Sequence, residues 1–178
     1  MPAIIIRAAT TADLGAINDI YNHYVRVCTC TYQEKPETPK ARRQWFRHHG
    51  KRYPVVVAEI AGRVVGWGSL SAFHARSAYR FTVENSVYVH HRYHGRGIGS
   101  RLLQELITCA RGLGYRAMIA GIDAEQTGSA ALHAKFGFKE VGRLKHVGFK
   151  FNRWLDVIYM ELLLKKPRAR APGRRAKR

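Results

Sequence analysis

Hydrophobic and polar residues alternate along the chain in two patterns, one typical of strands and one typical of helices. Short apolar runs rich in β-branched residues predict strands at residues 4–7, 54–60, 63–73, 81–89, 115–121, 138–150 and 154–164. Apolar residues at helical spacing predict helices at residues 14–27 and 39–46, from the glycines after residue 94 to about residue 112, and at residues 128–136. The apolar face of the first helix consists of Leu14, Ile17, Ile20, Tyr21, Tyr24 and Val25.

Local signals mark the ends of these elements. Thr10 followed by Asp13 is a helix cap with an acidic partner three residues on, and Thr38-Pro39 is a cap followed by proline at the first helical position. Turn residues at Ala61-Gly62 and at Asn152 separate two pairs of strands, so each pair is predicted to form a hairpin. The resulting order βααβββαβαββ predicts an α/β fold.

Length and composition predict one domain. The 178 residues, of which 46% are hydrophobic, fit a single core, and the sequence contains no repeat or interdomain linker. We place the domain at residues 1–164 and a basic tail at residues 165–178, which has no large apolar residue to bury and is expected to be disordered. No apolar run reaches the length of a signal peptide or a membrane span, which predicts a soluble cytoplasmic protein.

The positive charge of the chain is unevenly distributed. The formal net charge is +19, and residues 165–178 contain eight Lys or Arg and no acid, so residues 1–164 carry +11. A basic cleft in the domain suits an anionic ligand. The tail is read first as a solvated charged end, with nucleic-acid binding as the alternative.

Cysteines and histidines give no sign of a disulfide framework or a metal site. The chain has three cysteines, which is an odd number, and they form no C-x-x-C motif: Cys28, Cys30 and Cys109. The histidines at residues 90, 91 and 94 have no matched Cys or carboxylate ligands. We therefore expect reduced thiols and no metal.

The most informative segment runs from Ser86 to Leu103, where a strand leads into a glycine-rich turn that opens a helix. Gly95, Gly97 and Gly99 allow the backbone to bend sharply and to bring N–H groups close to an anion. The helix adds its positive N-terminal end, worth ~0.3–1 kcal/mol per anionic contact. The spacing fits neither the dinucleotide motif nor the Walker loop. The segment predicts a phosphate site, and the alternative is a tight turn that only caps an ordinary helix.

The glycine turn also carries a family resemblance. Arg92-Tyr-His-Gly95-Arg-Gly97 has the pattern R-x-x-G-x-G and resembles the pyrophosphate loop of the GNAT superfamily of N-acetyltransferases. The resemblance implies acetyl-CoA as co-substrate and a mixed, mostly antiparallel sheet that is splayed at the cofactor site, with helices on both faces. The residues that it implies in cofactor binding are Val87, Tyr88, Val89, Arg92, Gly95, Arg96, Gly97, Ile98, Gly99, Ser100 and Gln126. Gln126 stands where many relatives have Asn, and its longer amide can keep the contact.

Further motifs narrow the resemblance. Residues 79–89 and 129–138, with Gly142, Gly148-Phe-Lys150 and Trp154-Leu-Asp156, look like the phosphinothricin and methionine-sulfoximine N-acetyltransferases, and the match covers roughly residues 3–164. It implies direct transfer of acetyl to the α-amine of a small amino-acid-like acceptor, by a homodimer. The alternatives are an acetyltransferase for a protein or polyamine amine, and a basic nucleic-acid-binding module with a degenerate cofactor site.

Glu84 and His133 are the candidates for proton transfer. An amine must be neutral to attack a thioester, yet amine pKa values of roughly 8 to 10 keep most of it protonated near neutral pH. Glu84 lies in an apolar strand where burial raises a carboxyl pKa, and the resemblance also implies it as general base. His133 stands where many acetyltransferases have a tyrosine acid that serves the leaving thiolate. The alternatives are a solvent-side charge at Glu84 and a structural histidine at His133.

An amino-acid-like acceptor would be held by a bidentate arginine and by hydroxyl donors. Arg80 directly precedes the strand of Glu84, and Tyr32 lies in the predicted loop at residues 28–37. We expect both to bind the acceptor, with Tyr79 as a weaker candidate.

Overall fold

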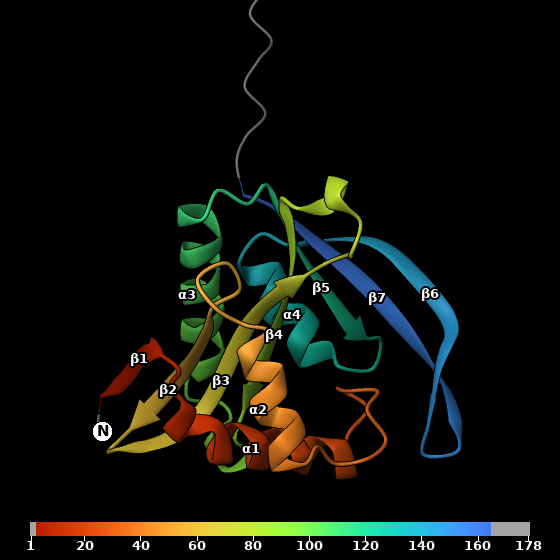
Figure 1. Ribbon diagram of the computed structural model, residues 1–178. Helices are drawn as coiled ribbons and strands as arrows, with labels where there is room; N and C mark the ends of the chain where they lie inside the picture. Colours follow the sequence, from red (N-terminus) through yellow and green to blue (C-terminus); the bar gives the residue numbers. More distant parts are fainter. Residues whose placement is uncertain (1–2, 165–178) are drawn as a thin grey trace, which may run out of the picture.

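The computed structural model describes residues 3–164, and the basic tail lies outside these residues (Figure 1). One seven-stranded sheet has the order β1-β2-β3-β4-β5-β7-β6. Its strands are β1 (Ile4–Ala8), β2 (Val55–Ile60), β3 (Arg63–Ala72), β4 (Thr82–Val89), β5 (Ala117–Asp123), β6 (Lys139–Lys150) and β7 (Arg153–Leu163). The helices are α1 (Leu14–Val27), α2 (Pro39–Arg47), α3 (Ile98–Gly112) and α4 (Thr127–Lys135), with short 3₁₀ turns η1 (Thr11–Asp13), η2 (Ser77–Tyr79) and η3 (His91–Tyr93).

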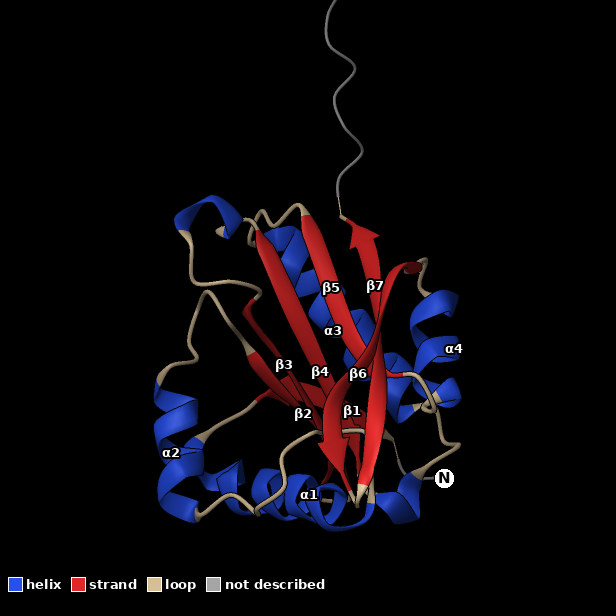
Figure 2. Ribbon diagram, turned by 90° about the vertical axis from the view of Figure 1, so that its right-hand side faces the viewer, coloured by secondary structure: helices blue, strands red, loops and turns tan. Residues whose placement is uncertain are grey.

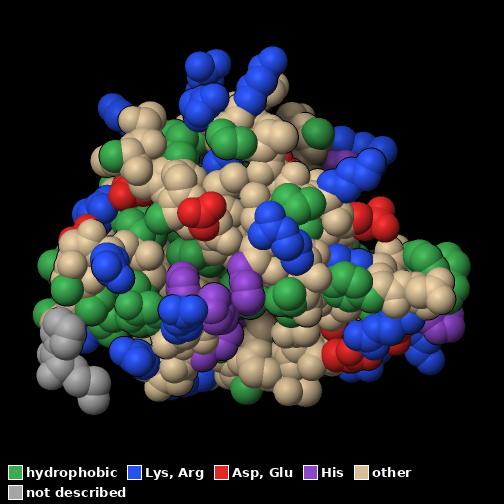
Figure 3. All heavy atoms as spheres, turned by 90° about the horizontal axis from the view of Figure 1, so that it is seen from below, with side chains coloured by type: hydrophobic (Ala, Val, Ile, Leu, Met, Phe, Trp, Pro, Cys, Tyr) green, Lys and Arg blue, Asp and Glu red, His purple; other side chains and the backbone are tan. Residues whose placement is uncertain are grey.

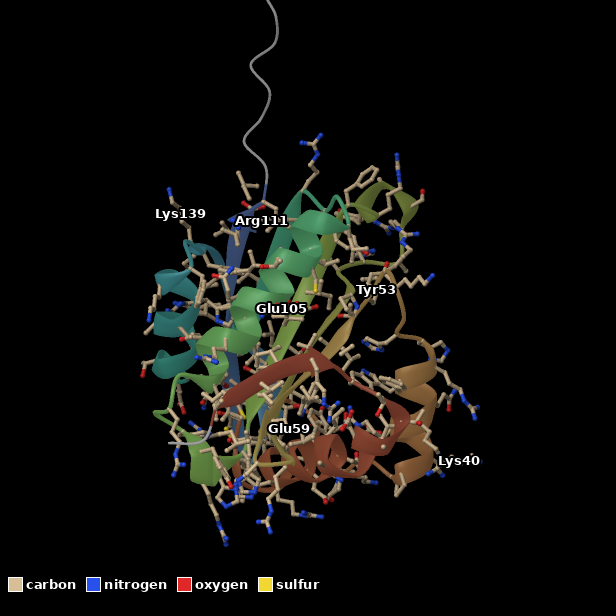
Figure 4. All side chains as sticks on the ribbon, turned by 90° about the vertical axis from the view of Figure 1, so that its left-hand side faces the viewer. Lys40, Tyr53, Glu59, Glu105, Arg111 and Lys139 are labelled. Carbon is tan, nitrogen blue, oxygen red and sulfur yellow. The ribbon has the colours of Figure 1, made fainter. Side chains whose placement is uncertain are left out.

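Helices cover both faces of the sheet, as the resemblance implies. On one face α3 packs across β1 to β4 (Figure 4). It buries Leu102, Leu103 and Leu106 completely. On the other face α1 packs on β3 and β4, where Ile17 joins a core that includes Trp67. Each helix buries one apolar stripe, because its large apolar residues recur at helical spacing. The long hairpin of β6 and β7 forms the outer part of the molecule (Figure 1).

Every predicted strand and helix is present, and the predicted caps form. The side chain of Asp13 accepts a hydrogen bond of 2.7 Å from the Thr10 N–H, and the hydroxyl of Thr38 accepts one of 3.1 Å from the Ala41 N–H. The fifth strand is shifted by two residues, to Ala117–Asp123. Tyr115 lies in the core before the strand begins, while pairing with β7 continues to Asp123. The predicted ends of the elements therefore differ where long-range packing decides them.

β4 and β5 are neighbours in the sheet (Figure 2), but their pairing is short and the sheet opens between them. Their parallel pairing spans only Thr82 to Glu84 on β4, whereas the ladder between β3 and β4 continues to Val89. All the other strand pairs of the sheet are antiparallel. The mostly antiparallel, splayed sheet is thus confirmed. Within residues 3–164, no helix is long and apolar enough to cross a membrane.

Candidate active site

A cavity of about 600 Å³ lies where β4 and β5 separate. Its walls come from the second half of β4, the glycine turn, the first turn of α3, the end of β5, and α4. The predicted cofactor residues that line it are Val87, Tyr88, Val89, Gly95, Gly97, Ile98, Gly99, Ser100 and Gln126. Arg92 and Arg96 do not line it: both side chains are exposed beside the turn, and the Arg96 guanidinium lies 5.0 Å from the centre of the Tyr93 ring.

The open edge of β4 forms one wall of the cavity. Beyond Glu84 this strand pairs with β3 but has no strand partner on its β5 side within the described part of the chain. An unpaired strand edge offers a row of N–H and C=O groups to any extended ligand with amides. One of these carbonyls, that of Val89, accepts hydrogen bonds from the Tyr24 hydroxyl and from His94 Nε2, the latter at 3.1 Å.

The glycine turn leads directly into α3. Gly97 caps this helix with φ +76°, a left-handed conformation that side chains with a Cβ adopt only under strain. The first N–H groups of an α-helix have no acceptor within the helix. Ile98, Gly99 and Ser100 bring this helix end to the cavity wall, which makes it a site for an anion.

Glu84 occupies the last paired position of β4 before the sheet opens. Its side chain is half-buried, and this burial raises the pKa of the carboxyl group. A Cβ built on Gly121 would lie 3.3 Å from Glu84 Oε1, so the carboxyl group sits against β5. Glu84 itself does not line the cavity, but Asn85 and Gly121 beside it do. The carboxyl group therefore lies next to the inner end of the cavity.

His133 is a buried histidine whose two ring nitrogens are both engaged. Nδ1 lies 2.8 Å from the Ser129 carbonyl oxygen, and Nε2 lies 2.9 Å from Asn85 Nδ2. Because a carbonyl can only accept, Nδ1 carries the proton and Nε2 accepts from the Asn85 amide. Burial lowers the pKa of His133, which favours this neutral form. Neighbouring residues on a strand face opposite sides, so Asn85 and Glu84 point to opposite faces of β4.

The predicted acceptor residues are not gathered in one place. The Tyr32 hydroxyl donates to Asp123 Oδ2 at 3.1 Å and to the Asp156 carbonyl at 3.0 Å, and Asp123 lines the cavity. Burial beside Asp123 raises the pKa of Tyr32. Tyr79 and Arg80 lie at η2, exposed and outside the cavity wall. Arg80 donates to the Ser77 carbonyl at 3.3 Å.

Sequence reasoning missed several residues of the cavity wall, among them Tyr24, Cys28, Cys30 and Asn85. Tyr24 belongs to the apolar face of α1, so its spacing indicated a core residue and gave no sign that its hydroxyl reaches β4. Asn85 follows Glu84 on the same strand, so its side chain points to the other face of β4. This alternation was the only sequence signal for a second polar group beside Glu84.

Histidines gather on the surface where α1 and η3 meet (Figure 3). His91 stacks between His23, at 4.1 Å between ring centres, and His90, at 4.4 Å. Burial, Arg92 and the neighbouring imidazoles lower the pKa of His90. In residues 3–164 no group of three His, Cys, Asp or Glu side chains is arranged to hold a metal ion.

A family model described as the acetyltransferase (GNAT) family matches residues 17–138. The chain belongs to this GNAT family. It is 39% identical over 160 residues to the L-methionine sulfoximine/L-methionine sulfone acetyltransferase of Salmonella typhimurium, covering 89% of this chain and 94% of that protein. It is also 39% identical over 161 residues to the phosphinothricin N-acetyltransferase of Alcaligenes faecalis, covering 89% of this chain and 82% of that protein.

Solved GNAT structures agree with the fold. The phosphinothricin acetyltransferase of Sinorhizobium meliloti, solved in complex with acetyl-CoA, superposes with a TM-score of 0.89 at 40% identity. The superposition covers 96% of this chain and 93% of that one. Relatives that match nearly the whole described chain therefore confirm both the GNAT family and the fold.

Proposed function

We propose that this GNAT enzyme transfers the acetyl group of acetyl-CoA directly to the α-amine of a small amino-acid-like acceptor, such as methionine sulfoximine or phosphinothricin. The observation that carries the proposal is the continuous wall formed by the open edge of β4, the glycine turn and the N-terminus of α3. This wall offers backbone amides and then a positive helix end, in the order that a pantetheine arm and a pyrophosphate require. The names of the relatives support the acceptor class.

In this proposal each predicted cofactor residue has a definite task. The backbone groups of Val87 and Val89, which face the open edge, pair with the amides of the pantetheine arm, and Tyr88 between them pairs with β3. The N–H groups from Gly95 to Ser100 hold the pyrophosphate, while the exposed Arg92 and Arg96 add positive charge at the entrance. Gln126 lies on the opposite wall, and its amide Nε2 contacts Thr29 Oγ1 at 3.4 Å, which keeps the longer side chain at the cavity.

Glu84 is proposed as the general base. Its raised pKa brings the carboxylate closer in basicity to the ammonium group that it must deprotonate, which makes proton transfer less uphill. The freed amine then attacks the thioester carbonyl, and the thiolate of CoA leaves. The carboxyl group lies beside the cavity wall rather than in it, so a water molecule is the proposed link between Glu84 and the amine.

We assign His133 a structural task instead of acid catalysis. Both ring nitrogens are already used, one by Ser129 and one by Asn85, so neither is free to protonate a thiolate. The imidazole fixes the amide of Asn85, whose Oδ1 is buried without a hydrogen-bond partner in the described part of the chain. Asn85 lines the cavity, and we propose that Oδ1 accepts a hydrogen bond from the bound cofactor or from water.

Among the acceptor residues, Tyr32 has the strongest support, because its hydroxyl is held by Asp123 at the cavity wall. Arg80 and Tyr79 stay predictions. They precede Glu84 on the same stretch of chain, and a guanidinium there would match the acceptor carboxylate.

We further propose a homodimer in the cytoplasm that protects its host from toxic amino-acid analogues. Acetylation removes the positive charge of the amine, so an analogue no longer matches a site built for an amino acid. The hairpin of β6 and β7 exposes many large apolar side chains for a self-association surface. They are Val141, Leu144, Val147, Phe149, Phe151, Trp154 and Leu163.

A panel of amines assayed by release of free CoA thiol tests the proposed activity. Methionine sulfoximine and phosphinothricin should be acetylated with a higher kcat/KM than spermidine or a lysine-containing peptide. The deaminated analogue of each acceptor serves as the control, because it keeps the rest of the molecule but has no nucleophile. Preference for the polyamine or for the peptide would overturn the proposed acceptor class.

A further inference from the structure

Two thiols lie at the cavity wall and take no part in the proposed transfer. Cys28 caps the C-terminal end of α1, Cys30 follows two residues later, and both line the cavity. The Cys30 N–H donates to Cys28 Sγ at 3.1 Å, and both cysteines are free thiols. The Cys28 sulfur is thus fixed by a backbone amide inside the cavity.

A buried cation lies under the same segment. Lys150, at the end of β6, is only 3% exposed, and its ammonium group donates to the carbonyls of Cys28 at 2.7 Å and Thr31 at 2.8 Å. These two carbonyls accept from two of the three N–H groups of Lys150, and because they are neutral they do not pair its charge. An anion close to this charge is favoured, and the thiols of Cys28 and Cys30, which both interact with Lys150, line the cavity.

The same contacts act on the ionisation of the two thiols. Hydrogen bonds from the side chain and backbone of Cys30, together with the charge of Lys150, lower the pKa of Cys28. The pKa of Cys30 is raised, because its thiol is the donor in this pair and is more deeply buried. On α3, burial and Glu105 raise the pKa of Cys109. Cys28 is therefore the thiol with the most thiolate character, and thiolates are the nucleophiles of disulfide exchange.

We propose that Cys28 is a modification site that forms a reversible mixed disulfide with CoA, supplied as CoA disulfide. The Cys28 thiolate attacks one sulfur of CoA disulfide, a bond forms between Sγ and that sulfur, and the original S–S bond breaks. The second CoA leaves as a thiolate and takes up a proton from water. One thiol and one disulfide are present before and after the step, and an added thiol reverses it. The inference rests on the proposed binding of acetyl-CoA in this cavity.

The cavity gives the reaction its selectivity. A disulfide that carries the CoA pyrophosphate and pantetheine arm can use the glycine turn and the edge of β4, whereas glutathione disulfide has neither group. The adduct would occupy the cavity and block acetyl-CoA, so the modification would switch the enzyme off. Lowered pKa alone does not produce this preference, because the intrinsic nucleophilicity of a thiolate falls as its pKa falls.

The test treats the full chain with CoA disulfide or with glutathione disulfide and follows intact mass, with fragment mapping of the peptide that contains both Cys28 and Cys30. We expect one CoA adduct on Cys28, formed about 10²-fold faster than the glutathione adduct, the lower end of the gain from a tethered partner. Excess acetyl-CoA should block the adduct, dithiothreitol should remove it, and acetyl transfer should fall and recover with it. Cys28→Ser should lose the adduct, whereas Cys30→Ser and the matched control Cys109→Ser should keep it.

Several results would overturn the inference. They are an adduct confined to Cys109 or Cys30, no adduct, an internal disulfide between Cys28 and Cys30 that retains no CoA, or equal rates with glutathione disulfide without protection by acetyl-CoA. Calorimetry of acetyl-CoA on the unmodified chain separates the two proposals. If acetyl-CoA does not bind, the proposed function fails; if it binds and Cys28 stays unmodified, only the present inference fails.

Discussion

The carboxyl group of Glu84 is half-buried where β4 and β5 separate, and this burial links catalysis to stability. The pKa of Glu84 is higher in the folded chain than in the unfolded chain. Its protonated form therefore contributes stability that is fully present below the unfolded pKa and is lost as pH rises through the folded pKa. The ionised form of Glu84, which serves as the base, therefore lowers the free energy of unfolding.

Glu84→Gln should remove this destabilisation together with the base. We expect turnover to fall by ~10²–10⁴-fold while acetyl-CoA affinity is kept. We expect the melting temperature to match the wild type below the unfolded pKa, to exceed it by a growing margin up to the folded pKa, and to keep that margin above it. Thermal unfolding between about pH 3 and pH 9 and kcat measurements between about pH 5 and pH 9 check the two effects. Wild-type turnover at every pH, or a change in melting temperature that is independent of pH, would contradict this role.

At His133 the structural and the catalytic assignments predict different measurements. His133→Ala leaves the Asn85 amide without its partner, at about 1–3 kcal/mol for the unsatisfied group, and removes the side-chain contact to the Ser129 carbonyl. We expect a clear loss of unfolding free energy and an unchanged shape of the pH–rate profile. His133→Gln carries both a donor and an acceptor and should recover part of the stability. An acid catalyst would instead lose turnover and one limb of the profile at normal stability.

At the scale of the element, the turn that opens α3 depends on the backbone of Gly97. A valine there meets no neighbouring atom but must adopt φ +76°, which costs about 1–3 kcal/mol for a residue with a Cβ. We expect Gly97→Val to distort the turn and to weaken acetyl-CoA binding in calorimetry. Gly112→Val is the matched control, since it ends the same helix in open space without a positive φ. Unchanged affinity in Gly97→Val would refute the role of the turn.

The elements of this fold could be predicted because their signals are local. Caps, turn glycines and apolar periodicity lie within a few residues of one another, and each predicted strand and helix is found. The insertion of β7 between β5 and β6 is not local, since it depends on pairing between strands far apart in sequence. The resemblance to a family implied the splayed sheet, which periodicity could not show.

The candidate site likewise has a part that the sequence could predict and a part that it could not. The glycine turn is one continuous motif, so its residues could be chosen from the sequence. The Asn85–His133 contact joins residues 48 positions apart, and the Lys150–Cys28 contact joins residues 122 positions apart. Such pairs depend on tertiary packing and leave no spacing to recognise. Tyr79 and Arg80 were predicted because they lie close to Glu84 in the sequence. Closeness in sequence does not fix the tertiary position, and both residues lie outside the cavity wall.

At the scale of the whole molecule, the exposed hairpin of β6 and β7 bears on the oligomeric state. Trp154 is 63% exposed and packs edge-on against Phe149, with ring centres 5.1 Å apart. If this surface joins two copies, Trp154→Glu should convert the dimer to a monomer in light-scattering chromatography. Leu113→Glu is the control, because Leu113 is an exposed apolar residue outside the hairpin. A monomeric wild type, or a Trp154→Glu variant that stays dimeric, would contradict the proposed interface.

The basic tail is the other feature of the whole chain that can be tested. It lies outside the described residues, so the prediction rests on composition: without large apolar residues the tail has nothing to contribute to the core. Deleting residues 166–178 removes seven positive charges and should leave turnover and melting temperature unchanged. Any DNA binding by the full chain should fall with salt, with a slope of about 0.9 per phosphate contact, and should weaken on truncation. If truncation abolishes acetyl transfer, the tail is part of the active site and the domain does not end at residue 164.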